Sequence, residues 1–208
     1  MKTQIDTQGL FDYDGGFYGK IAMVFDCFML NVLWIVFSLP IVTFGAASTA
    51  FYYTAVKVIK KDRGNILEQF LNAFKINFKD ATILWLLIVV LSFIFQLNVG
   101  ILSSLTEGNV SLFFRCFYIF LSVFIIGIAM YAFPALSRFD MSTSWILKLS
   151  IYMTVRYFPI TLILFVILLL SALLLYLLPI FVIILPTGSI IVYSYFMEKV
   201  LLKHTPGV

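Results

Sequence analysis

The longest charge-free stretch of the sequence is Tyr157–Met197, YFPITLILFVILLLSALLLYLLPIFVIILPTGSIIVYSYFM, a run of 41 residues. A single helix of that length would measure about 60 Å, twice the thickness of the hydrocarbon core of a bilayer. Pro179 and Pro186 lie in its second half, where they favour a tight turn between two helices. The stretch therefore predicts two membrane crossings, at about 157–178 and 180–197.

The chain contains three more stretches without charged residues, Cys27–Val56, Ala81–Thr106 and Cys116–Ser137. Each is long enough for the roughly 20 apolar residues that a transmembrane helix needs. Apolar residues make up 62% of the chain and charged residues 12%, about half the usual share in soluble proteins. The stretches are apolar around every helical face, as lipid-facing helices are. The sequence predicts an all-α, polytopic helical membrane protein.

Basic residues lie mainly between these stretches. The segments 57–80 and 138–156 and the C-terminal tail carry Lys and Arg, whereas the link at 107–115 carries only Arg115, at its end. Short loops rich in Lys and Arg remain on the cytoplasmic side of a membrane. We therefore expect basic cytoplasmic loops at 57–80 and 138–156, a cytoplasmic C-terminus and an outward-facing link at 107–115.

The first hydrophobic block, Ile21–Val56, has 36 residues, which is too long for one crossing and slightly short for two. Pro40 divides it. One crossing gives five transmembrane helices with the N-terminus outside, and two crossings give six with the N-terminus inside. The acidic N-terminal segment is poor in Lys and Arg and favours five. The predicted single membrane domain, residues 1–208, has helices at about 21–56, 81–106, 110–137, 157–178 and 180–197.

A run of small residues follows the proline of this block. Small residues let two helices approach closely within a membrane. In a long, kinked first helix, the run would pack against another helix of the chain or against a partner protein. The residues of this predicted helix-packing or partner face are Pro40, Gly45, Ala46 and Thr49.

The spacing of apolar residues predicts an amphipathic helix near 66–79, with Asp62 or Asn65 as its N-cap. The residues expected on its apolar face are Leu67, Phe70, Leu71, Phe74 and Phe78. We expect this helix to lie on anionic headgroups at the cytoplasmic interface or to dock a partner protein. The cytoplasmic basic surface around it comprises Lys57, Lys60, Lys61, Arg63, Lys75 and Lys79.

Few polar residues fall inside the predicted membrane segments, and ionisable residues there are candidates for function. In one interpretation these residues only support the fold. Asp26 and Arg115 could pair with each other or extend their charged groups to the membrane surface, and the amides could hydrogen-bond between helices. The other reading makes them a cluster that binds a solute or a proton. We favour the structural reading. The candidate intramembrane polar cluster consists of Asp26, Asn31, Gln96 and Arg115.

The sequence contains no recognisable catalytic or metal-binding motif. The single histidine, His204, lies in the terminal tail, and no HExxH, CxxC, GxSxG or P-loop pattern occurs. We therefore expect no catalytic residues, no metal site, no cofactor and no nucleic-acid partner. The two cysteines, Cys27 and Cys116, lie at the edges of hydrophobic segments, and we expect both to be free thiols.

Several short segments resemble the YesL-like family, a group of small bacterial integral membrane proteins whose domain has no known function. The resemblance lies in Asp26-x4-Asn31-x2-Trp34, in SLPIVTxGAA from Ser38, in NAFKxNFKxAT from Asn72 and in FPALxRFD from Phe133, and it extends over roughly residues 17–200. It implies a bacterial plasma-membrane protein encoded near carbohydrate ABC importers and glycan-degrading enzymes. The family provides no catalytic or binding residues to carry over.

Together these features predict a five-helix plasma-membrane protein that is a non-enzymatic accessory component of carbohydrate uptake of the oligosaccharide ABC type. Its expected partners are the lipid bilayer, ABC permease subunits and a second copy of itself. One alternative is a small autonomous transporter or channel that uses the four polar residues to line a path. Another is a membrane regulator that signals through its basic loops.

Overall fold

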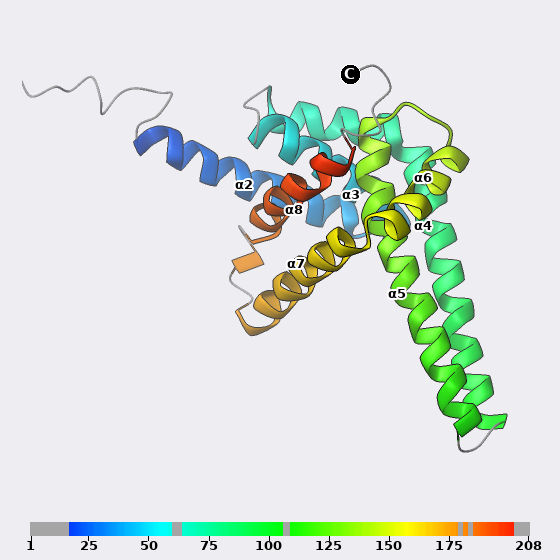
Figure 1. Ribbon diagram of the computed structural model, residues 1–208. Coiled ribbons are helices and arrows are strands. Elements are labelled where there is room, and N and C mark those ends of the chain that lie inside the picture. The colour runs from blue at the N-terminus through cyan, green and yellow to red at the C-terminus, as the bar shows by residue number, and fades with distance from the viewer. Residues whose placement is uncertain (1–16, 60–63, 106–108, 179–180, 183–184, 202–208) are drawn as a thin grey trace, which may run out of the picture.

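The computed structural model describes residues 17–59, 64–105, 109–178, 181–182 and 185–201, and these residues form helices joined by short connections, without a strand (Figure 1). The all-α prediction is confirmed. The acidic segment before residue 17 lies outside the described residues. The α-helices are α2 (Phe17–Ser38), α3 (Phe44–Thr54), α4 (Ile66–Leu105), α5 (Asn109–Arg138), α6 (Thr143–Arg156), α7 (Phe158–Leu177) and α8 (Leu185–Leu201).

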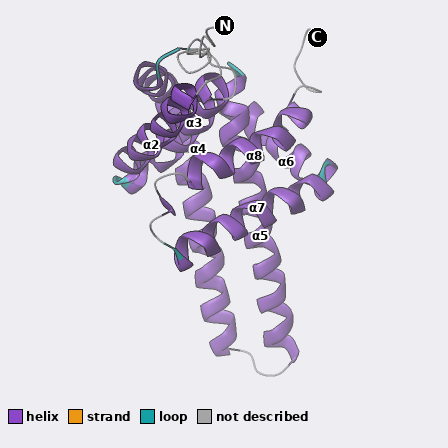
Figure 2. Cartoon of the chain, turned by 90° about the vertical axis from the view of Figure 1, so that its left-hand side faces the viewer, coloured by secondary structure: helices purple, strands orange, loops and turns teal. Residues whose placement is uncertain are grey.

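The longest helices, α4 and α5, form an antiparallel hairpin, and the end of α4 and the start of α5 lie at the far end from α6 (Figures 1 and 2). The other helices pack across the half of the hairpin near α6, and most of them run obliquely to its axis. The half that contains the connection projects beyond them in both views. The molecule is therefore a long hairpin with a compact group of helices at one end, not a bundle of parallel helices.

Three helical segments are long and apolar enough to cross a membrane: Ile66–Leu102, Val110–Arg138 and Phe158–Leu177. A fourth, Ala22–Ser38, is also apolar but shorter. Helix α8 has 17 residues and a mixed composition. The chain is a membrane protein whose described residues include three or four helices suited to crossing, and the predicted number of five is not confirmed.

The first hydrophobic block is divided into two helices instead of forming the long kinked helix predicted at 21–56. Helix α2 ends at Ser38, because Pro40 has no N–H donor and keeps the residue before it out of the helical conformation. The hydroxyl of Thr43 donates to the carbonyls of Phe37, at 2.6 Å, and Pro40, at 2.8 Å. These bonds hold the turn into α3, whose 11 residues are too few to cross a bilayer.

Helix α3 packs closely on α4 and α5 through its small residues. A Cβ atom built on Gly45 would lie 2.6 Å from the carbonyl oxygen of Ala81 and 2.7 Å from Cβ of Trp85. Ala46 and Thr49 are fully buried. Only glycine allows this approach between α3 and α4, because any side chain would displace the α4 backbone.

The amphipathic helix predicted at 66–79 forms the first turns of α4, but its buried face differs from the predicted one. Phe70 is fully buried, whereas Leu67 and Phe78 are 47% and 41% exposed. The ring of Phe37 on α2 lies 5.4 Å from that of Phe70 and 4.9 Å from that of Phe74. Contact with α2 and α3 therefore determines which residues of this segment are buried within the protein.

The start of α4 confirms one of the two predicted caps. The side-chain oxygen of Asn65 accepts a hydrogen bond from the Leu67 N–H at 2.9 Å, as an N-cap residue does. Gly64 precedes it with a φ of 96°, a left-handed conformation that favours glycine. The other predicted cap, Asp62, lies outside the described residues.

Candidate functional site: an apolar cavity beside the hairpin

The four residues predicted to form an intramembrane polar cluster do not lie together. Asp26 and Asn31 are on α2, which crosses the end of the hairpin near α6. Gln96 and Arg115 are exposed and belong to the hairpin segments that project beyond the other helices. Asp26 and Arg115, which the sequence allowed to pair or to snorkel, thus belong to different parts of the fold.

Asn31 has the structural role that the sequence favoured for it. Its side chain is 1% exposed, and its oxygen accepts a hydrogen bond from the Thr187 hydroxyl at 2.7 Å. The same hydroxyl lies 3.3 Å from the carbonyl oxygen of Cys27. These contacts fix the start of α8 against the middle of α2.

The predicted helix-packing or partner face is buried inside the protein. Gly45, Ala46 and Thr49 are inaccessible, and Pro40 is exposed in the turn before α3. In this structure Gly45, Ala46 and Thr49 face other helices of the same chain, so these three residues are not accessible to a partner protein. Small residues allowed a close contact, but the sequence alone could not distinguish a helix of the same chain from one of another protein.

The predicted basic surface is only partly described, because Lys60, Lys61 and Arg63 lie outside the described residues. Lys75 and Lys79 are exposed on α4. Lys57 is half-buried, and its ammonium group donates to the Tyr53 hydroxyl at 2.8 Å and to the side-chain oxygen of Gln69 at 2.7 Å. Lys57 therefore joins the end of α3 to the start of α4.

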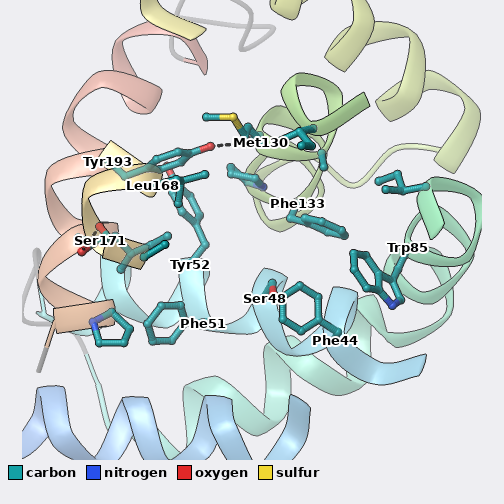
Figure 3. A pocket seen from close by; sticks show the side chains of 18 of the residues that line it. Phe44, Ser48, Phe51, Tyr52, Trp85, Met130, Phe133, Leu168, Ser171 and Tyr193 are labelled. Carbon is teal, nitrogen blue, oxygen red and sulfur yellow. Dashed lines mark hydrogen bonds between the residues drawn. The ribbon is translucent and has the colours of Figure 1, made fainter. Parts of the chain in front are cut away.

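A cavity of about 640 Å³ lies between the hairpin and helices α2, α3, α7 and α8 (Figure 3). Its walls are almost entirely apolar. The figure shows Trp85 and Phe133 of the hairpin on one side, and Leu168, Ser171 and Tyr193 of α7 and α8 on the other. A cavity of this size falls within the range of small-molecule binding sites.

Aromatic rings in contact with one another form the hairpin side of the cavity. The ring of Phe44 lies 4.7 Å from that of Trp85, which in turn lies 6.4 Å from that of Phe133. The indole N–H of Trp85 donates to the carbonyl oxygen of Ile41 at 2.7 Å. This bond orients the Trp85 ring, because it ties the ring to the turn before α3.

Hydroxyl groups on the opposite side bond to one another or to the backbone. Ser171 on α7 lies 2.7 Å from Ser189 on α8, oxygen to oxygen, and both also donate to carbonyls of their own helices. The Tyr193 hydroxyl donates to the carbonyl oxygen of Met130. The buried hydroxyl of Tyr52 has no hydrogen-bond partner among the described residues. These groups join α7 and α8 to each other and α8 to the hairpin.

An ion pair joins the end of α5 to α8. The guanidinium of Arg138, at the end of α5, lies 2.7 Å from the carboxylate of Glu198 on α8. Their side chains are 26% and 13% exposed, so solvent screens the pair only in part. The two cysteines are free, with Cys27 buried and Cys116 exposed.

The family model that matches this chain is DUF624. Its description is "Protein of unknown function, DUF624", and the match covers residues 27–99. The match agrees with the YesL-like resemblance of the sequence over this region, which is about a third of the chain. The matched residues include most of α2, all of α3 and most of α4, and thus one wall of the cavity. No curated protein and no solved structure matches the chain.

The cavity was not predicted from the sequence. Its lining comes from six helices, and the lining residues of the membrane segments are of the same types as the residues that face lipid. Ser171 and Ser189 could have indicated part of it, because hydroxyl groups in apolar helices often lie at contacts between helices. That signal locates an interface, but it does not show that the interface leaves a space.

Proposed function

We propose that the protein is a non-enzymatic accessory component of oligosaccharide uptake of the ABC type in a bacterial plasma membrane. The resemblance to the YesL-like family supports this role, since it implies a genetic association with carbohydrate importers. The proposed topology has five crossings, an outer N-terminus and a cytoplasmic C-terminus, as the distribution of Lys and Arg indicates.

The observation that carries the proposal is the separation of the polar residues. A saccharide is bound through many hydrogen bonds, and a transporter gathers polar groups in one cavity near the middle of the membrane. Here Asp26 and Asn31 are on α2, whereas Gln96 and Arg115 are on the part of the α4–α5 hairpin that projects beyond the other helices. The cavity described above is apolar. These features count against an autonomous saccharide carrier and favour a protein that acts on another membrane protein.

The projecting half of the hairpin is the surface we propose for a permease. Phe93, Leu97, Phe113 and Phe117 are between 47% and 66% exposed there, and a Cβ atom on Gly100 would meet no other atom within 4 Å. Helices of another membrane protein could pack along this surface, because no other described helix covers it. This surface replaces the buried run after Pro40 as the predicted partner face.

Affinity purification of the tagged protein from its native membrane in a mild detergent, followed by mass spectrometry, tests the role. We expect ABC permease subunits in stoichiometric amounts. Phe113→Ala with Phe117→Ala should reduce their recovery. Phe158→Ala, which changes a similarly exposed phenylalanine on α7, should not. Recovery of the protein without any transport subunit would contradict the proposal and would favour an autonomous function.

A further inference from the structure

We propose that the apolar cavity binds one acyl chain of a membrane phospholipid, which enters sideways between α5 and α7. The inference does not depend on the proposed role in uptake, because it rests only on the cavity. It assigns a ligand class, a long hydrocarbon chain, to a site formed by the hairpin and the helices packed against it.

The lining favours hydrocarbon over water. A buried water molecule needs two to four polar partners, and a cavity without them stays dry. The hydroxyls of Ser171 and Ser189 bond to each other. The Ser48 hydroxyl accepts a hydrogen bond from the indole N–H of Trp34 at 3.4 Å. The Tyr52 hydroxyl has no hydrogen-bond partner among the described residues, but the rest of the lining is mainly aliphatic and aromatic, so an acyl chain would meet an almost wholly apolar wall.

Exposed residues that line the cavity lie on helices suited to crossing a membrane. Ile126 on α5 and Leu168 on α7 both line the cavity, and yet they are 44% and 40% exposed. Both lie within segments suited to crossing a membrane. Phe51 and Tyr52, on the α3 side of the cavity, are only 5% and 2% exposed. The accessible edge of the site is therefore at the gap between two lipid-facing helices, where acyl chains are the surrounding medium.

The size of the cavity fits a chain and makes an empty site unfavourable. Apolar cavities of about 150 Å³ hold a benzene molecule, and this one is roughly four times as large, at about 640 Å³. Atoms that line a void lose their dispersion contacts on that side. Transfer of an acyl chain from bilayer to cavity brings no hydrophobic gain, since both are apolar. The recovered contacts with the cavity wall therefore favour binding.

Photo-crosslinking in reconstituted vesicles tests the proposal. The probe is a phosphatidylcholine that carries a diazirine in the middle of one acyl chain, and adducts are mapped by peptide mass spectrometry. We expect adducts on the half-buried lining residues Ser92, Ala129 and Ile190, together with adducts on exposed residues such as Phe120. Wild-type adducts confined to exposed residues would overturn the proposal, whatever the behaviour of any variant.

Two neighbouring substitutions on α7 provide the control. Ala172 lines the cavity, and Leu173 does not and is 52% exposed. Ala172→Phe should abolish the cavity adducts, whereas Leu173→Phe should keep them, and both should keep the adduct on Phe120. An equal effect of the two substitutions would count against binding in the cavity. A diazirine fatty acid that labels the cavity when the phospholipid does not would show that the chain has another source and would overturn the assignment to phospholipid.

Discussion

At the scale of single residues, contacts are set by how little space a side chain occupies and by where its hydrogen-bonding atoms point. Gly45 is the clearest case, because the backbone of α4 lies where its Cβ atom would be. Thr187 is a second case. Its hydroxyl on α8 donates to the side chain of Asn31 on α2, although the two residues are 156 positions apart in the sequence. Both residues contribute to contacts between helices, and substitution of each leads to a testable prediction.

Substitution of Gly45 by alanine should destabilise the fold. The added methyl would lie 2.6 Å from a backbone carbonyl, and overpacking of this kind costs about 1–3 kcal/mol. Gly100→Ala is the matched control, because its Cβ would meet no atom within 4 Å. It should leave stability unchanged or raise it by about 0.5–1 kcal/mol. Thermal unfolding in detergent measures both, and equal stability of the two variants would refute the close contact of α3 with α4.

Replacement of Thr187 by valine should weaken the contact of α8 with α2. Valine keeps the shape of threonine but cannot donate to Asn31, and the loss should cost about 0.5–2 kcal/mol. Thr82→Val is the control, because the Thr82 hydroxyl is buried without a hydrogen-bond partner among the described residues. It should be neutral or stabilising. Unfolding free energies in the same detergent would show the difference, and an equal loss in both variants would contradict this assignment.

At the scale of elements, α8 depends on contacts spread along its whole length. Thr187 bonds to α2 near its start, Tyr193 to the Met130 carbonyl in its middle, and Glu198 to Arg138 near its end. Its 17 residues are short for a crossing, so these contacts, more than length or hydropathy, hold the helix in place.

Removal of the ion pair should loosen the end of α8. Glu198→Ala leaves the half-buried Arg138 without this partner, and we expect faster amide exchange over the last two turns of α8. Glu68→Ala changes an exposed acidic residue on α4 and should leave that exchange rate as it is. Hydrogen exchange with mass spectrometry makes the comparison. Unchanged protection of α8 in Glu198→Ala would mean that the other contacts suffice.

At the scale of the whole molecule, the hairpin gives the protein two distinct ends. Helix α6 and the start of α4 lie at one end, and the end of α4 and the start of α5 lie at the other (Figures 1 and 2). Described basic residues such as Lys75 and Lys79 on the first turns of α4 and Lys148 on α6 belong to the elements at the first end. The proposed orientation places that end in the cytoplasm and the connection outside.

Cysteine labelling in intact cells tests this orientation. In a variant without native cysteines, Val110→Cys near the connection should react with a membrane-impermeant maleimide. Ser144→Cys on α6 should react only after the membrane is permeabilised. Leu178→Cys, after α7, should react from outside if α7 and α8 both cross. Labelling of Ser144→Cys in intact cells would reverse the topology, and protection of Leu178→Cys would contradict five crossings.

The sequence alone determined that the chain is an all-α membrane protein, because helices in lipid must be long, apolar and free of charge whatever surrounds them. It also identified Asn65 as one of two candidate caps and Pro40 as the residue that divides the first block, since both effects act within a few residues. Only the tertiary structure decided that α2 and α3 are separate helices, which face of 66–79 is buried, and that the polar residues lie apart.

The cavity belongs to this second group. The same apolar residue types face lipid, another helix or a cavity inside the protein. Composition therefore cannot distinguish these three environments. The run from Gly45 to Thr49 shows the same limit, because its small side chains permit close packing without specifying the partner. What decides is the relative placement of six helices, and that placement depends on contacts between residues that lie far apart in the chain.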